Sequence, residues 1–210
     1  MKTKVTLIAI WVLAFSIWAN AQTPVHAAQN VLARLLPGQQ KNFVFKQIPP
    51  DSGRDVYRIY SAGDGKIHIE GNSGVSMSAG LYYYLRKYCN VSTSWTGDQL
   101  HMPAILPKPE HAIRLVSAYA HRFTYNYCTF SYSMAFWDWK RWEKELDWMA
   151  LHGVNLSLAI VGQEAVWQNT LKHFGYTMPR SNSLFAARPL MRGGSWGIWK
   201  DGAAQQLNRG

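Results

Sequence analysis

The chain has 210 residues, of which 48% are hydrophobic and 14% aromatic, which excludes a disordered or fibrous protein and is enough for one or two packed domains. The formal net charge of +10 does not indicate a nucleic-acid partner, because residues 1–21 carry two of these charges and residues 178–210 carry four, leaving an ordinary +4 for residues 22–177. Cys89 and Cys128 are compatible with one disulfide in an exported chain or with two separate thiols, and no metal-ligand spacing is present.

The first 21 residues have the three parts of a cleavable signal peptide. Lys2 and Lys4 form a short basic region, residues 5–18 form an apolar run, and residues 19–21 (Ala-Asn-Ala) match the small-x-small cleavage pattern. The apolar run is shorter than the roughly 20 residues of a membrane-spanning helix, which disfavours a permanent anchor. We therefore expect a secreted or periplasmic protein with no membrane segment after cleavage.

Residues 22–110 predict a small N-terminal α+β domain. The Asp64-Gly65 pair lies between two alternating segments and favours a tight hairpin. Three tyrosines at 82–84 could stack on a sugar, but their helical spacing favours packing against the sheet. Three prolines in residues 100–110 indicate an extended linker. The expected elements are a helix at 31–36, strands at 41–48, 56–60 and 66–70, and a helix at 76–88.

Residues 111–177 predict two successive βα units of a parallel sheet. A segment rich in β-formers, 117–125, precedes a helix that begins at the N-cap Asp138 and stops at Gly153. An apolar strand at 154–160 and a helix at 165–174 complete the second unit. On the first helix we expect a buried stripe of Trp142, Leu146, Met149 and Ala150, and largely solvated side chains at Arg141, Glu143, Lys144 and Glu145.

Polar residues follow both of these strands. Asn126 and Cys128 come after the first, and Gln163 and Glu164 come after the second. The carboxyl ends of parallel strands form the face on which α/β barrels keep their sites. Glu164 equally fits a role in capping the helix that it opens, where the helix dipole favours a negative charge.

These residues resemble a known family. The segments 126–133 (NYCTFSYS), 137–159 (WDWKRWEKELDWMALHGVNLSLA) and 162–168 (GQEAVWQ) are similar to α-N-acetylglucosaminidases of glycoside hydrolase family 89. Residues 74–88 (GVSMSAGLYYYLRKY) resemble the N-terminal domain of the same family. The resemblance covers roughly residues 30–177 and implies an α/β fold: a small N-terminal α+β domain followed by the first two βα units of an incomplete (β/α)8 TIM barrel.

The resemblance also implies a chemistry. It implies retaining hydrolysis of a glycan with terminal α-linked N-acetylglucosamine, by one glutamate nucleophile and one glutamate acid/base, without a metal or organic cofactor. By motif position, Asn126 would hydrogen-bond sugar hydroxyls, Cys128 would line the pocket, and Tyr132 would offer a ring face or a phenol. The family's two catalytic glutamates lie beyond the second βα unit, so no catalytic residue is assigned here and Glu164 is not one of them.

Residues 178–210 depart from the family pattern and show neither helical nor alternating periodicity. Back-translation with a shift of one nucleotide lets residues 191–205 read YAWWLMGNLEGWGGP, which has the expected Trp- and Gly-rich character. Trp196-Gly197 must then yield a glycine and Trp199-Lys200 a glutamate. We expect a one-nucleotide deletion near the Thr177 codon and a disordered, out-of-frame tail; a genuinely divergent tail is the alternative.

Three functions remain open on this basis. The first is an enzyme-family fragment that is inactive alone, because two βα units cannot close a barrel and leave strand edges open. The second is a noncatalytic secreted carbohydrate-binding protein that uses Asn126, Cys128 and Tyr132. The third is a protein-interaction module built on residues 22–110. The sequence does not indicate an oligomeric state.

Overall fold

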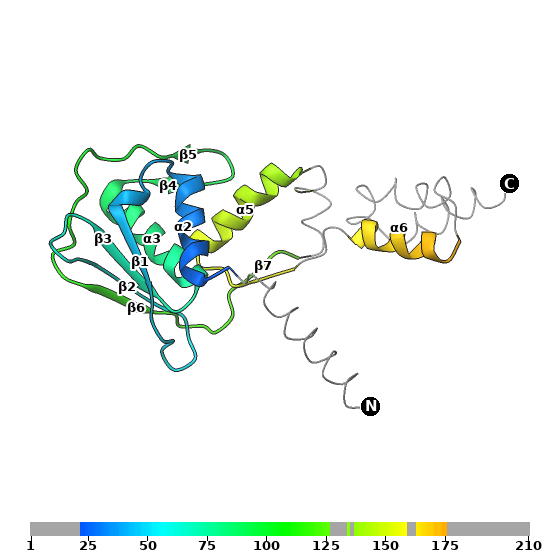
Figure 1. Ribbon diagram of the computed structural model, residues 1–210, viewed down its shortest axis with the longest axis horizontal. Coiled ribbons are helices and arrows are strands. Elements are labelled where there is room, and N and C mark those ends of the chain that lie inside the picture. Colours follow the sequence, from blue (N-terminus) through cyan, green and yellow to red (C-terminus); the bar gives the residue numbers. More distant parts are fainter. Residues whose placement is uncertain (1–21, 127–133, 135–136, 159–162, 176–210) are drawn as a thin grey trace, which may run out of the picture. The chain divides into compact units, whose positions relative to one another are not determined.

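The computed structural model describes residues 22–126, 134, 137–158 and 163–175 (Figure 1). Its chain forms two compact units. Among the described residues, the first unit contains residues 22–120 together with Ala150–Gly153, and the second contains those of 121–149 and 154–175. Within the described residues, no helix is long and apolar enough to cross a membrane.

A four-stranded sheet is the centre of the first unit. It has the order β1-β3-β2-β6, in which β1 (Phe43–Gln47) runs parallel to β3 (Ile67–Gly71), and β2 (Val56–Ser61) runs antiparallel to both β3 and β6 (Ile113–Val116). The predicted hairpin of β2 and β3 is thereby confirmed. Strand β6 lies beyond the boundary that we predicted at residue 110, because it completes this sheet by pairing with β2.

Two helices, α2 (Pro24–Leu35) and α3 (Gly74–Cys89), cover one face of this sheet (Figure 1). Helix α3 begins with a capping box between Ser73 and Ser76 and ends at Asn90, whose φ of 54° is left-handed. Helix α2 starts seven residues before the predicted helix. The signal was present in Thr23, whose hydroxyl accepts a hydrogen bond from the amide of His26, and in Pro24 at the first helical position.

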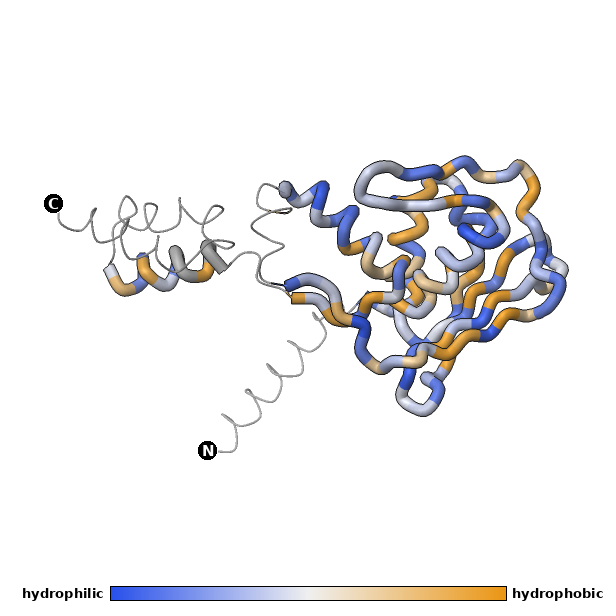
Figure 2. The backbone as a smooth tube through the Cα atoms, turned by 180° about the vertical axis from the view of Figure 1, so that it is seen from behind, coloured by the Kyte–Doolittle hydropathy of each residue, from blue (hydrophilic) through white to orange (hydrophobic). Residues whose placement is uncertain are grey.

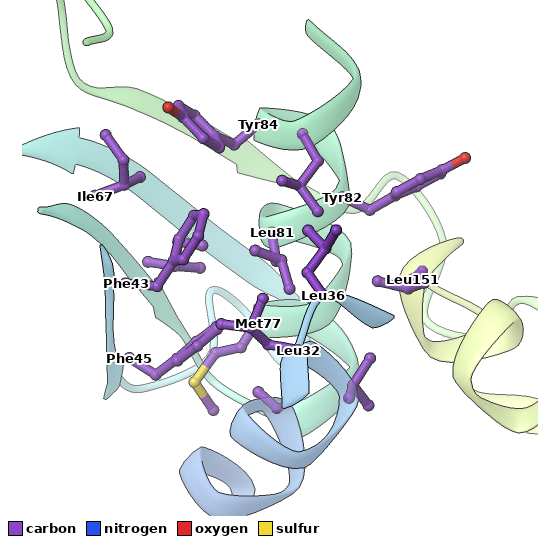
Figure 3. Close-up of a cluster of buried hydrophobic side chains, with 14 of the residues drawn as sticks. Leu32, Leu36, Phe43, Phe45, Ile67, Met77, Leu81, Tyr82, Tyr84 and Leu151 are labelled. Atoms are coloured by element: carbon purple, nitrogen blue, oxygen red, sulfur yellow. The ribbon is translucent and has the colours of Figure 1, made fainter. Parts of the chain in front are cut away.

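The hydrophobic core of the first unit lies between these helices and the sheet (Figure 3). Tyr84 is fully buried, packs edge-on against Phe43 at 5.8 Å between ring centroids, and donates a hydrogen bond to the carbonyl of Pro107 at 2.8 Å. Tyr82 is also buried, so the packing role predicted for this helix's tyrosines is confirmed for these two. Leu151, at the end of helix α5, belongs to the same core.

The segment predicted to be an extended linker packs on this core instead. Leu100, Met102 and Leu106 are half-buried against the core residues. A small hairpin that the sequence did not reveal precedes them, with strands β4 (Ser92–Thr93) and β5 (Asp98–Gln99). The Tyr82 hydroxyl accepts a hydrogen bond from the Thr93 amide at 3.0 Å and so fastens this hairpin to α3.

Hydropathy alternates along the strands of the sheet (Figure 2), so successive side chains point to opposite faces and several polar ones lie on the face away from the helices. Glu70 is only 7% exposed there. It lies 3.9 Å from Lys46 and 3.6 Å from Arg58, and it accepts a hydrogen bond from the Tyr60 hydroxyl at 3.1 Å. Three donors from neighbouring strands therefore compensate a nearly buried carboxylate.

The second unit has the predicted order of strand, helix, strand and helix. Strands β7 (Phe123–Thr124) and β8 (Leu156–Ser157) pair in parallel, α5 (Trp139–Leu151) connects them, and α6 (Gln163–His173) follows. Strand β7 is much shorter than the predicted 117–125. The mixed α/β class and the parallel pairing of the first two βα units are confirmed.

Candidate functional site

The site is built at the carboxyl end of strand β7. The strand is held to β8 by a main-chain hydrogen bond from the Leu158 amide to the Thr124 carbonyl, 3.4 Å long. At the opposite end of the pair, the Asn155 side chain accepts a hydrogen bond from the Arg122 amide at 2.8 Å. The direction in which the chain leaves β7 is therefore fixed at both ends of the pair.

Tyr125 follows β7 directly and has a left-handed backbone, with a φ of 73°. A bulky residue rarely adopts this conformation, and such strain is found most often at functional sites, where the surrounding structure maintains it. The residue after it is Asn126, which is exposed. The turn at Tyr125 thus sets the direction of the first residue that the sequence predicted to contact a sugar.

The phenol of Tyr125 is held by a buried carboxylate. It donates a hydrogen bond to Oε1 of Glu145, which is 0% exposed, and Oε2 of Glu145 lies 3.0 Å from Nη1 of Arg141. The guanidinium of Arg141 in turn stacks on the ring of Trp137, 3.8 Å from its centroid. Burial raises the pKa of the Tyr125 phenol well above its ordinary value of 10, and the hydrogen bond to Glu145 raises it further. Tyr125 is therefore a neutral hydrogen-bond donor at physiological pH.

This arrangement corrects the predicted helix face. We expected Glu145 to be solvated and Leu146 to be buried, but Glu145 is completely buried and Leu146 is 45% exposed. The apolar stripe prediction is right for Met149, which is 5% exposed. The periodicity of a single helix could not reveal the buried carboxylate, because Tyr125, which compensates it, comes from another element.

Both predicted ends of helix α5 are confirmed. The Asp138 carboxylate accepts a hydrogen bond from the Arg141 amide at 2.8 Å, as an N-cap does. Gly153 has a φ of 74°, and the Val154 amide bonds back to the Met149 carbonyl at 2.9 Å in the manner of a Schellman motif.

Of the three predicted sugar-pocket residues, the structure describes Asn126. Cys128 and Tyr132 lie outside the described residues. Glu164 lies in the first turn of α6. Cys89 is a buried free thiol, and its possible disulfide partner Cys128 lies outside the described residues. Within the described part of the chain, no group of three or more His, Cys, Asp or Glu side chains could hold a metal ion.

A parallel βαβα order with polar residues at the carboxyl end of its strands is typical of α/β proteins, the class that includes the (β/α)-barrel enzymes. Comparison with known families specifies the class further. The N-terminal domain of the alpha-N-acetylglucosaminidase (NAGLU) family matches residues 26–108. The tim-barrel domain of the same family matches residues 122–204. The chain belongs to the α-N-acetylglucosaminidase family, glycoside hydrolase family 89, and its second unit is the beginning of that family's TIM barrel.

The relatives are much longer than this chain. Human alpha-N-acetylglucosaminidase is 38% identical over 175 residues, which is 81% of this chain and 24% of the human protein. The family 89 glycoside hydrolase from Clostridium perfringens, solved in complex with PUGNAc, matches with a TM-score of 0.72 and 39% identity over 80% of this chain and 19% of its own. The same protein, with two glutamate-to-glutamine substitutions, was solved with its substrate GlcNAc-α-1,4-galactose at the same similarity.

Proposed function

We propose that the chain is an N-terminal part of an exported, exo-acting α-N-acetylglucosaminidase, which hydrolyses terminal α-linked N-acetylglucosamine with retention of configuration. The observation that carries this proposal is the match of two consecutive family domains in the expected order, residues 26–108 and then 122–204. Solved relatives carry PUGNAc or GlcNAc-α-1,4-galactose, which supports an N-acetylglucosamine glycoside as the substrate class.

In this proposal the chain supplies one wall of the sugar pocket but not the catalytic carboxylates. Asn126, at the carboxyl end of β7, supplies an amide that can donate to and accept from sugar hydroxyls, and the family resemblance assigns Cys128 and Tyr132 to the same pocket. The resemblance implies that the two glutamates lie beyond the second βα unit, and this chain spans only 19% of the Clostridium perfringens protein. The chain alone is therefore expected to be inactive.

Export is proposed from the sequence of residues 1–21. The basic start, the short apolar run and the Ala-Asn-Ala pattern support a cleaved signal that delivers the protein to the periplasm or the medium. N-terminal sequencing of the mature protein should begin at Gln22. A mature protein that retains Met1 would contradict export by cleavage.

An assay with an α-linked aryl N-acetylglucosaminide tests the catalytic part of the proposal. The purified chain should release no N-acetylglucosamine, whereas a version extended by the shifted reading frame after Thr177 and its downstream sequence should be active. Activity of the 210-residue chain itself would refute the proposed division of the site. Soluble chain that binds N-acetylglucosamine, with an inactive extended version, would instead favour a noncatalytic carbohydrate-binding protein.

The frame change is tested separately. Resequencing the locus across the Thr177 codon should reveal one missing nucleotide or an intact longer frame. The family's barrel domain matches the chain in its given reading frame through residue 204, and this observation speaks against the predicted shift. The shift would be refuted if resequencing returned the codons for residues 178–210 unchanged and if neither the given frame nor the frame shifted by one nucleotide continued with a family-like sequence.

A further inference from the structure

We propose that Glu145 is a positioning residue for the sugar-binding wall, acting through Tyr125 on the chain that leaves strand β7. The proposal rests on the proposed function in one respect, namely that the segment beginning at Asn126 contacts the amino sugar. It adds a residue on the first barrel helix to a site whose predicted members all follow the strand.

The first support is that Glu145 is fully buried, although a charged side chain is not needed to fill a buried position. A carboxylate with 0% exposure loses its hydration, and this loss is compensated only if charged or polar partners replace the water. Two partners do so, namely the Arg141 guanidinium, 3.0 Å away, and the Tyr125 hydroxyl. An apolar residue would fill this position at lower cost, so the carboxylate indicates a need for a strong acceptor.

The second support is the conformation of the residue that the carboxylate holds. Tyr125 has a φ of 73°, and it is one of three non-glycine residues with a positive φ among those described. Asn90 ends a helix, where asparagine adopts this conformation readily, and Ser52 is a small residue in a turn. The bulky Tyr125 needs an external constraint, and the hydrogen bond to a buried, charged acceptor is such a constraint.

The third support is the chain of contacts that fixes Glu145 itself. Arg141 lies one helical turn before Glu145, its guanidinium stacks on the Trp137 ring, and its amide is held by the N-cap Asp138. The first turn of α5 therefore holds Arg141, Arg141 and the helix hold Glu145, and Glu145 holds Tyr125. This order of contacts links the start of the helix to the end of the strand.

Local hydrogen exchange in the purified chain tests the proposal. Tyr125→Phe removes the hydroxyl and keeps the ring, so the Leu158 amide, which bonds to the carbonyl beside Tyr125, should exchange roughly ten times faster. The Val154 amide, which bonds within the same unit at the end of α5, should be unchanged. A matched control is Tyr60→Phe, which removes a similar tyrosine–glutamate hydrogen bond in the first unit and should leave Leu158 unaffected.

A second pair of variants tests the route through the acceptor. Glu145→Gln keeps an oxygen that can accept from Tyr125, whereas Glu145→Ala does not, so the first should keep most of the Leu158 protection that the second loses. Equal loss in both variants would contradict the route through Tyr125. Unchanged exchange in Tyr125→Phe would overturn the proposal even if neither Glu145 variant folds.

Binding of PUGNAc, measured by calorimetry on the same proteins, separates this inference from the proposed function. We expect Tyr125→Phe to weaken PUGNAc binding about tenfold, in line with the loss of a hydrogen bond to a charged group. If the unmodified chain does not bind PUGNAc but exchange at Leu158 still rises, the sugar-binding role fails and the link from Glu145 to the strand stands. If PUGNAc binds and neither measurement responds to Tyr125→Phe, the inference fails and the binding role stands.

Discussion

Gly71 offers a quantitative test of how the first unit is packed. It is the last residue of β3 and is paired with Gln47 of β1 on one side and Tyr57 of β2 on the other. A Cβ atom at this position would lie 2.6 Å from Oγ of Ser76, 2.7 Å from Cγ of Met77 and 2.9 Å from the Met77 amide nitrogen. Because the strand is held on both edges, the first turn of α3 must move.

The expected cost of Gly71→Ala follows from these distances. Overpacking of this kind costs roughly 1–3 kcal/mol. The loss of chain entropy in the unfolded state returns about 0.4–1 kcal/mol. We therefore expect a net destabilisation of roughly 1–2 kcal/mol, which lowers the Tm of a unit of this size by on the order of 10 °C.

Gly97→Ala is the matched control, because no atom lies within 4 Å of its Cβ position and its φ is not in the left-handed region. It should change stability by less than about 0.5 kcal/mol or increase it slightly. Urea unfolding, with hydrogen exchange of the α3 amides as the reporter of the first unit, measures both variants. Equal stability of Gly71→Ala and the unmodified chain, or an equal loss in Gly97→Ala, would refute the reasoning.

Two further outcomes are expected. Leu151→Ala should destabilise the first unit by about 2–5 kcal/mol, because Leu151 is 3% exposed and belongs to its core. Leu146→Ala, at a side chain 45% exposed on the same helix, should cost under about 1 kcal/mol. Similar losses of stability in the two variants, measured by urea unfolding, would contradict this. The hydrogen bond and charge of Arg114 lower the pKa of Asp51 below 3.8, so this pair stabilises the unit above the unfolded pKa, and the contribution is lost as pH falls through the lower folded pKa. Asp51→Asn should therefore flatten the acid side of the stability profile below about pH 4. An unchanged profile would show that the pair contributes nothing.

The sequence predicted those elements whose signals are local. The Asp64-Gly65 turn, the Asp138 cap and the Gly153 stop each depend on residues within a few positions, and all three are present in the structure. Family motifs then identified the fold around them. Strands β4 and β5 were missed because two residues each are too few to show alternation.

The failures share a different cause. Glu145 was expected in solvent because charged residues on a helix normally face water, and its partner Tyr125 lies 20 residues away in the chain. Residues 113–116 were expected to belong to the barrel. They form strand β6 of the first unit instead, because they pair with the distant residues 56–59 of β2. Contacts at such separations depend on the tertiary structure, and hydropathy patterns do not contain them.

The membership of Leu151 in the first unit has a consequence for synthesis on the ribosome. The sheet and its two helices are complete once residue 120 has been made, but the core lacks Leu151 until the chain extends about thirty residues further. At roughly 5–20 residues per second, this delay is on the order of seconds. During that interval the nascent N-terminal unit exposes the apolar core side chains that Leu151 later covers. Exposed apolar surface of this kind is what chaperones bind on ribosomes.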